Sequence, residues 1–150
     1  MRIVIQRVSR ASVKVADETV GKIENGLLVF LGISHDDQEE DVHWLAKKLM
    51  NLRIFNDDEG KMNLSLNDVD GEVLMVSQFT LHASTKKGNR PSFVKSANPN
   101  LGKRLYDYFI DYLNKEYKIS VATGVFGAMM EIELLNDGPV TIIMDSKNKE

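Results

Sequence analysis

The first third of the chain alternates apolar and polar positions with the period of β-strands. Arg2 to Val8 defines two faces, and short strands are predicted for Ala11 to Val15 and for Thr19 to Glu24, around a polar turn. Asn25-Gly26 is a strong hairpin signal, and the continuous apolar run from Leu27 to Ile33 is typical of a strand covered on both faces. Four strands are therefore predicted to open the chain.

Two later segments have the spacing of amphipathic helices. The acidic cluster at 36–41 precedes apolar residues at 42, 45, 46, 49 and 50. Carboxylates in a first helical turn favour the helix dipole, so this cluster is predicted to start a helix rather than to bind a metal. Asn98 and Pro99 supply an N-cap and a proline at the first helical position of a long helix, whose apolar face runs from Leu101 to Tyr112.

Between the predicted helices, the pattern indicates one further strand with a loop on each side. Residues 56–71 are polar and turn-rich and are predicted to form a surface loop. Glu72 to Phe79 is predicted to be a central strand, and His82 to Phe93 a basic loop.

The end of the chain is predicted to hold two strands, from Met129 to Leu135 and from Val140 to Met144. They flank the turn-forming sequence Asn136-Asp137-Gly138-Pro139, and residues 146–150 are predicted to be a frayed tail. With no internal repeat or linker, the chain is predicted to be a single α+β domain over residues 1–150.

Composition narrows the class of protein. The 150 residues are 43% hydrophobic and 27% charged, which is ordinary for a soluble globular domain with its own core. No apolar run approaches the roughly 20 residues needed to span a bilayer, and no signal-peptide pattern opens the sequence. The absence of cysteine excludes disulfides, thiolate metal sites and a cysteine nucleophile. We therefore expect a cytoplasmic protein with no membrane partner.

Charge is distributed unevenly along the sequence. The net charge is −3, yet residues 73–106 contain no Asp or Glu and carry six positive charges. The rest of the chain therefore carries −9, the difference between −3 and +6. Such asymmetry focuses a positive field on one surface, as a phosphate backbone requires, although acidic neighbours from elsewhere in the fold would neutralise it.

Several common catalytic patterns are absent. The three histidines, His35, His43 and His82, show no metal-ligand spacing, so no metal site and no cofactor are predicted. Ser77 and Thr80 lie at a strand end, but the Gly-x-Ser-x-Gly pattern of serine hydrolases is missing. The glycines of residues 124–127 lack the lysine and the spacing of a phosphate-binding loop.

Taken alone, the two most distinctive segments have ordinary explanations. Ser77-Gln78-Phe79-Thr80-Leu81 is explained as a strand end whose polar groups satisfy neighbouring backbone. Asn136-Asp137-Gly138-Pro139 is explained as a hairpin connection, and base rates favour a trans Gly-Pro bond, since only about 5–6% of such bonds are cis.

Together, in this order and in a chain of this length, the two segments resemble the D-aminoacyl-tRNA deacylases, also called D-tyrosyl-tRNA deacylases. The resemblance covers the whole chain. Its further segments are Ile5-Gln6-Arg7-Val8, Arg10-Ala11-Ser12-Val13, Gly26-Leu27-Leu28-Val29, Arg53-Ile54-Phe55, Gly60-Lys61-Met62-Asn63, Arg90-Pro91-Ser92-Phe93 and Thr123-Gly124.

The resemblance implies a fold, an activity and an assembly. The fold is a mixed and antiparallel, barrel-like sheet with two main helices. The activity is hydrolysis of the ester between a D-amino acid, or mischarged glycine, and the 3′ end of tRNA. The assembly is a homodimer, in which Gly138-Pro139 is cis and is contributed by each subunit to its partner's site. An L-amino acid would collide with that backbone, which is selection by exclusion.

The resemblance also implies roles for individual residues. Arg7 holds the Gly138-Pro139 element, and Met130 flanks the substrate pocket. In the catalytic segment of Ser77, Gln78, Phe79 and Thr80, the amides of Phe79 and Thr80 are expected to stabilise the oxyanion, while the side chains of Gln78 and Thr80 shape the pocket. Threonine needs a base to act as a nucleophile and the sequence shows none, so the ribose hydroxyl of tRNA is expected to assist an attacking water.

The basic loop gains a role from the same resemblance. Lys86, Lys87 and Arg90 are expected to receive the phosphates of the tRNA acceptor end. Val125 departs from the family, in which many members carry Arg or Lys at this position, so a contact to phosphate or adenosine is expected to be missing. The competing hypothesis is a non-catalytic, nucleic-acid-binding dimer.

Overall fold

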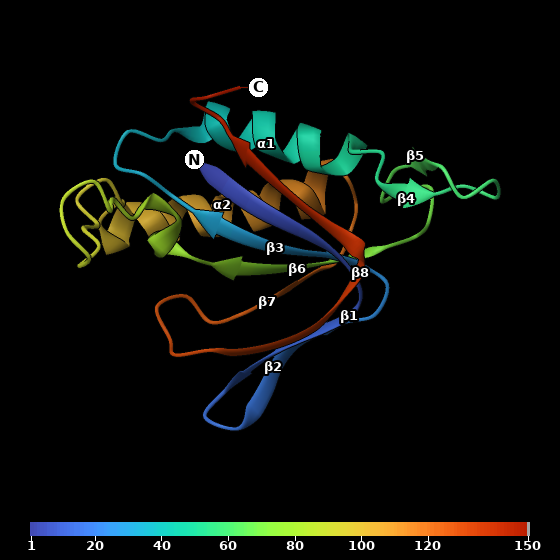
Figure 1. The fold of residues 1–150 in the computed structure, drawn as a ribbon, viewed down its shortest axis with the longest axis horizontal. Helices are drawn as coiled ribbons and strands as arrows, with labels where there is room; N and C mark the ends of the chain where they lie inside the picture. The colour runs from blue at the N-terminus through green and yellow to red at the C-terminus, as the bar shows by residue number, and fades with distance from the viewer. Residues whose placement is uncertain (150) are drawn as a thin grey trace.

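The computed structural model of the chain describes residues 1–149. In chain order its elements are β1 (Arg2–Val15), β2 (Glu18–Ile23), β3 (Gly26–Gly32), α1 (Glu39–Asn51), β4 (Phe55–Asn56), β5 (Met62–Leu64), β6 (Glu72–Ser77), the 3-10 helix η1 (Phe79–His82), α2 (Pro99–Glu116), β7 (Val121–Thr123) and β8 (Glu131–Asp145). The main sheet has the strand order β2-β1-β3-β6-β7, and β8 pairs with β1. An α+β fold with a mixed sheet and two main helices is thus confirmed (Figure 1).

Strand β1 organises the sheet, because it pairs with three other strands. Its first half is antiparallel to β3, its second half is antiparallel to β2, and β8 runs antiparallel along both halves. Four opening strands were predicted, and this was wrong. Three form, since the segments on either side of the exposed residues Ser9 and Arg10 are joined into one strand by pairing with β8.

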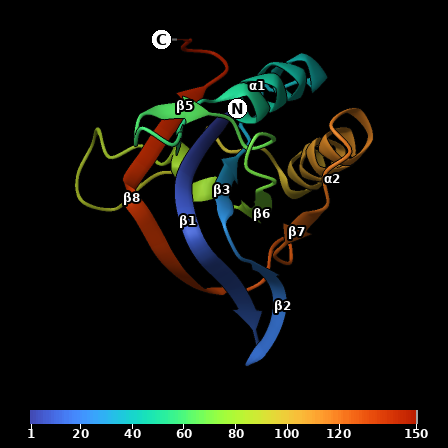
Figure 2. The same ribbon diagram turned by 90° about the vertical axis from the view of Figure 1, so that its right-hand side faces the viewer.

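The sheet curls toward a barrel (Figure 2). At Gly21 in β2, an added Cβ would lie 2.5 Å from the carbonyl oxygen of Thr123 in β7. The two outer strands of the sheet order therefore approach each other closely, and glycine provides the space. This curvature is the barrel-like form that the resemblance implied.

Both helices pack on one side of the sheet (Figure 2). The predicted apolar positions of α1 are buried, and the acidic residues lie in its first turn as expected. The side chain of Asn98 accepts a hydrogen bond from Leu101 N at 3.0 Å, which confirms the predicted N-cap of α2. From α2, the buried Tyr106 hydroxyl donates to the Met75 carbonyl at 2.8 Å and ties the helix to β6.

The last part of the chain differs from its prediction. Two strands joined by a hairpin turn were predicted, but a single strand, β8, follows β1 throughout. Gln6 pairs with Thr141 and Val8 pairs with Asn136, so residues 137–140 lie opposite Arg7 alone. The Gly-Pro step therefore lies in a bulge formed by residues 137–140 of one long strand, because pairing with β1 continues on both sides of it.

The predicted frayed tail is also corrected for residues 146–149. Ser146 is buried, its amide donates to the Met1 carbonyl at 2.9 Å, and its hydroxyl accepts from the Met1 amino group. Lys147 donates to Asp41 at 2.9 Å, and Lys149 lies over the Trp44 ring. These contacts anchor the segment against α1, while residue 150 lies outside the described part of the chain.

Two smaller elements refine the predicted loops. The segment 56–71, predicted as a loop, begins within the small β4–β5 hairpin. The strand predicted to reach Phe79 ends at Ser77, after which the chain turns into η1. Within residues 1–149, neither helix has the length and apolarity required to cross a membrane.

Candidate active site

The first motif, Ser77-Gln78-Phe79-Thr80-Leu81, occupies the end of β6 and the turn that follows. Ser77 ends the strand, and the Gln78 amide donates to the Leu31 carbonyl at 2.8 Å, so the neighbouring strand β3 supports this position. Phe79 and Thr80 then begin η1. The first N–H groups of a helix have no partner within it, so these two amides are available to an oxyanion.

Side chains of the first motif contact one another. The Gln78 amide nitrogen donates to the Thr80 hydroxyl oxygen. The Phe79 ring is exposed and meets Phe93 edge to face, with ring centroids 5.0 Å apart. The partner of Thr80 is therefore an amide, which does not take up protons near neutral pH.

The second motif is the bulge at residues 137–140, and its backbone is fixed by side chains. Gly138-Pro139 is a cis peptide, as the resemblance implied. The Asn136 side-chain nitrogen donates to the carbonyls of Arg7 and Val140, both at 3.0 Å, and closes the bulge at its base.

Arg7 supports the same bulge from within the protein. The side chain is buried, and its Nη1 donates to the Ile54 carbonyl. Its Nε contacts Asp137 twice, at 3.2 Å from the carbonyl and at 3.1 Å from the carboxylate. A guanidinium with several fixed acceptors presents a rigid fork, so Arg7 holds the backbone beside Gly138 in a fixed position.

Gly138 has a backbone conformation that other residues rarely adopt. Its φ is +129°, and an added Cβ would lie 2.9 Å from Val140 N and 3.0 Å from Arg7 Nη2. Only glycine fits this position without displacing its neighbours. The second motif is thus a backbone element, built by residues that do not themselves need to touch a ligand.

The structure does not bring the two motifs together within one chain. Arg2 donates to the Leu81 carbonyl of η1, whereas Arg7 holds the bulge. The two arginines are five residues apart on β1, roughly 17 Å along a strand, and their side chains point to opposite faces. Figure 1 agrees, since β6 ends at the left of the sheet and the middle of β8 lies at the right.

Met130 lies on the side of the sheet that carries the smaller hydrophobic cluster. It precedes β8 and packs against a hydrophobic cluster that includes Val76, near the end of β6. Its sulfur lies 2.5 Å from where a Cβ on Gly124 would stand, so Met130 and Gly124 are in direct contact. Exposed Val125 follows at the same edge.

The basic loop leaves the first motif and is closed at its base. Ser84 and Ser92 exchange two backbone hydrogen bonds of 2.8 and 2.9 Å. Lys86, Lys87 and Arg90 lie between them and are exposed. Among the described residues, no carboxylate lies within 4.0 Å of these three cations, so the positive charge at the tip is not neutralised by the fold.

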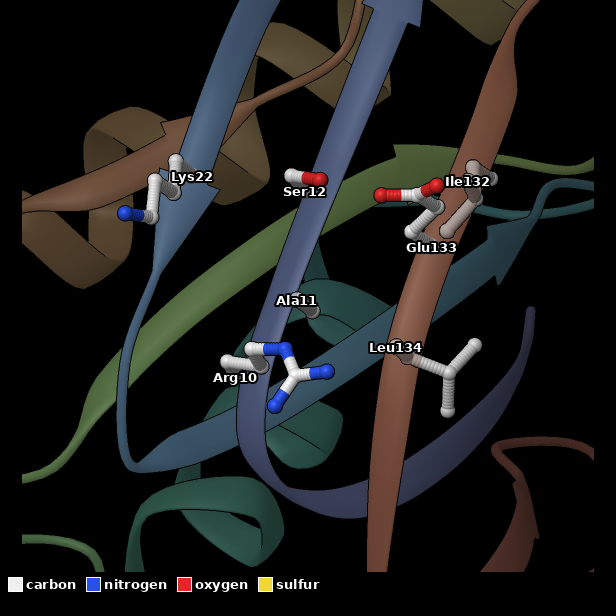
Figure 3. A pocket seen from close by; sticks show the side chains of 7 residues that line it. All are labelled: Arg10, Ala11, Ser12, Lys22, Ile132, Glu133 and Leu134. Carbon is white, nitrogen blue, oxygen red and sulfur yellow. The ribbon is translucent and has the colours of Figure 1, made fainter.

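Asn136 and Asp137 were predicted only as turn formers, and their part in building the second motif was missed. An asparagine at the start of a Gly-Pro segment is the available signal, but Arg7, the partner of both residues, is distant in sequence. A separate open hollow of about 450 Å³ is lined by Arg10, Lys22 and Glu133, among others. Figure 3 shows these side chains on β1, β2 and β8. No predicted site residue lines the hollow.

Comparison with known proteins identifies the family. The model of the family described as "D-Tyr-tRNA(Tyr) deacylase" matches residues 4–145. The D-aminoacyl-tRNA deacylase of Thermosipho africanus is 57% identical over 147 residues, 98% of each chain. That of Flavobacterium johnsoniae is 54% identical over 150 residues, the full length of both.

Two solved structures share the fold. A c-Myc DNA Unwinding Element Binding Protein is 40% identical with a TM-score of 0.91, over 97% of this chain and 98% of that one. A probable eukaryotic D-amino acid tRNA deacylase is 20% identical with a TM-score of 0.81, over 95% and 97%, and shows the fold alone. With both motifs in place and a family match over nearly its full length, the chain belongs to the D-Tyr-tRNA(Tyr) deacylase family.

Proposed function

We propose that this protein is a hydrolase that cleaves the carboxylic ester of D-aminoacyl-tRNA, and of mischarged glycyl-tRNA, while rejecting L-aminoacyl-tRNA. One observation supports this most strongly: both motifs present backbone groups, and their supporting side chains are engaged in holding that backbone. A site made of backbone reads the amine, Cα and carbonyl shared by all amino acids and ignores the side chain. A hydrolase that accepts D-aminoacyl-tRNA esters with many different side chains requires recognition of this kind.

The working site is proposed to form between two copies of the chain. The first motif of one subunit receives Gly138-Pro139 of the other. Within one chain the two motifs are far apart, because the arginines that support them, Arg2 and Arg7, lie at separate points of β1. Strand β8 supports this assembly. Its outer edge pairs with no strand in the described chain, and large apolar side chains in or beside it are exposed, with Ile143 at 67% and Met129 at 92%. Exposed apolar surface of this kind marks interfaces.

In the proposed site, D- and L-amino acids are distinguished by whether they fit sterically against the Gly138-Pro139 backbone. The carbonyls of Gly138 and Pro139 hold the substrate's α-amino group, and Met130 borders the pocket. Because the bulge is fixed by Arg7 and Asn136, it does not retreat from a misplaced substituent. An L-amino acid, with its side chain directed at this backbone, is excluded by collision. Glycine has no side chain and is accepted.

Chemistry is assigned to the first motif. The amides of Phe79 and Thr80 stabilise the oxyanion of the tetrahedral intermediate, at the end of a strand supported by β3. The ribose hydroxyl of tRNA assists the attacking water. Thr80 shapes the pocket through its hydrogen bond with Gln78, because an amide partner does not supply the base that a threonine nucleophile needs.

The basic loop is proposed to receive the acceptor end of tRNA. Lys86, Lys87 and Arg90 lie beyond the first motif with no neutralising carboxylate nearby, so their field is directed outward. Val125, which follows Gly124, is exposed but uncharged, so it adds no contact to phosphate. A substrate of this kind places the enzyme in the cytoplasm, at work in translation quality control.

The first prediction separates the hydrolase from the alternative, a non-catalytic nucleic-acid-binding dimer. The alternative is kept because the solved structure that is 40% identical is of a DNA Unwinding Element Binding Protein. Incubated in parallel, D-tyrosyl-tRNA is expected to lose its ester rapidly and L-tyrosyl-tRNA to remain intact, as measured by release of labelled tyrosine. Equal and slow loss of both esters would contradict the hydrolase and favour the alternative.

The second prediction concerns the chiral element. Gly138→Ala places a Cβ against Val140 and Arg7, so the bulge must move, and a displacement of about 1 Å costs on the order of 100-fold in rate. We expect deacylation of D-tyrosyl-tRNA to fall by at least about tenfold on that scale, in a protein that remains folded. The control is Gly60→Ala, which also has positive φ but meets no atom within 4 Å. Wild-type rate and selectivity in Gly138→Ala would remove this element from recognition.

The third prediction concerns the water-activating group. Thr80→Ala is expected to retain measurable deacylation, because loss of a nucleophile costs about 10⁴-fold or more whereas loss of a pocket contact costs far less. Mass spectrometry of the wild-type enzyme, quenched during turnover, is expected to show no aminoacyl group on Thr80. Abolished hydrolysis with intact binding of a substrate analogue would restore the threonine to a chemical role.

A further inference from the structure

The 3-10 helix η1 carries both proposed oxyanion donors, yet it is only four residues long. Helices of this length and type have poor hydrogen-bond geometry and no cooperative stability of their own. Oxyanion donors must nevertheless hold their positions closely to be effective. The placement of η1 therefore depends on the residues beneath it.

Gly32, at the end of β3, forms the floor under η1. An added Cβ there would lie 2.9 Å from the Leu81 Cβ, 3.0 Å from the Gln78 carbonyl oxygen and 3.2 Å from the His82 ring. The turn thus rests directly on the backbone of β3, with no space between. Arg2 of β1 is the strand partner of Gly32, so the Arg2 side chain starts next to the residue on which η1 rests.

Arg2 connects η1 to the sheet. Its Nη1 donates to the Leu81 carbonyl at 2.8 Å. Its Nε and Nη2 both donate to Asp145 Oδ2, at 3.0 and 2.9 Å. The fork of one guanidinium is therefore fixed on β8 at one side and holds a carbonyl of the catalytic turn at the other.

His82 ends η1 and is turned into the protein. Its side chain is buried, and its Nε2 has no hydrogen-bond partner among the described residues. The charged groups that act on the ring are Arg2 of β1, the Met1 amino group just before β1, and Asp37 from the segment before α1. Asp37 already accepts hydrogen bonds from the Met1 amino group and from Ser34 N. The surroundings of His82 consequently favour the uncharged imidazole ring.

We propose that Arg2 and His82 are positioning residues that hold η1 in its catalytic place, and that efficient deacylation requires neutral His82. Neither side chain needs to touch substrate. Arg2 holds the turn by its Leu81 carbonyl, and the buried His82 ring packs beside Gly32 under the turn. The inference rests on the proposed function for its effect on rate, whereas its effect on the turn itself is measurable without substrate.

The pH dependence follows from the surroundings of His82. Burial lowers the pKa of its imidazole, the Met1 amino group and Arg2 lower it further, and the Gly32 backbone and Asp37 oppose this shift only in part. The neutral ring is therefore favoured in the folded state. Its stabilising contribution is complete above an unfolded pKa of about 6.5 and is lost as the pH falls through the lower folded pKa. Below that pH, a proton on His82 displaces η1.

The fourth prediction is kinetic. For wild-type enzyme, kcat for D-tyrosyl-tRNA is expected to fall on an acid limb below about pH 6.5, with KM changing little. His82→Asn, which stays neutral, is expected to lack this limb. Arg2→Met is expected to lower kcat by at least about tenfold at pH 7 with KM within about twofold, as for loss of a positioning contact. Rates are taken per folded enzyme, with the folded fraction measured by circular dichroism at each pH.

Matched controls are available elsewhere in the chain. His43→Asn removes a partly buried histidine that bonds Tyr108, and Arg53→Met removes an arginine that donates to the Asn63 carbonyl. Both are expected to keep the wild-type kcat and acid limb. An acid limb in His82→Asn identical to that of wild type, or an unchanged kcat in Arg2→Met, would overturn the proposal.

Hydrogen exchange tests the same inference without substrate. The Leu81 and Ala83 amides donate within the turn, to Gln78 and Thr80. In Arg2→Met these amides are expected to exchange at least about tenfold faster, while amides of α2 keep their protection, as for local opening. Unchanged protection of the turn would contradict the inference even if D-tyrosyl-tRNA were not a substrate. A wild-type enzyme without deacylation at any pH would instead contradict the proposed function alone.

Discussion

The buried guanidinium of Arg7 is the interaction on which the second half of the site depends. It stands on the central strand, opposite four residues of β8 that have no strand partner of their own, and it satisfies carbonyls from two separate segments. Removing such a group leaves the buried Ile54 carbonyl unpaired, at a cost of about 1–3 kcal/mol. The same contacts that stabilise the fold therefore fix the direction of the Gly138-Pro139 backbone.

Both halves of the proposed site follow one principle, in which side chains support the backbone and the backbone is left to meet a substrate. Arg7 and Asn136 hold the bulge from inside, and Arg2 and Gly32 hold the catalytic turn from below. Backbone groups held in this way have little freedom to adapt. That rigidity suits recognition by exclusion, because a yielding wall would admit the wrong enantiomer. Strand β1 carries both supports at separate points, and this separation is the reason for proposing that a second copy completes the site.

Local patterns predicted the elements better than their connections. The helices and the buried strand β3 followed from apolar spacing and caps, because those signals lie within each segment. The Gly-Pro segment did not, since Asn-Asp-Gly suits a hairpin and a bulge equally, and pairing of β8 with distant β1 decides between them. The anchored tail at Ser146 likewise depends on Met1, at the other end of the chain. The site residues came from a family resemblance, whereas the packing of His82 required the folded structure.

Subunit mixing tests the central claim, a site shared between two copies, most directly. One partner carries Phe79→Pro, which removes a proposed oxyanion amide at a helix position that accepts proline. The other carries Gly138→Ala, and each variant alone is expected to be nearly inactive. After random exchange, half of the dimers are mixed and each has one intact composite site, so activity is expected to recover to about a quarter of wild type. No recovery in verified mixed dimers would show that both halves act within one chain.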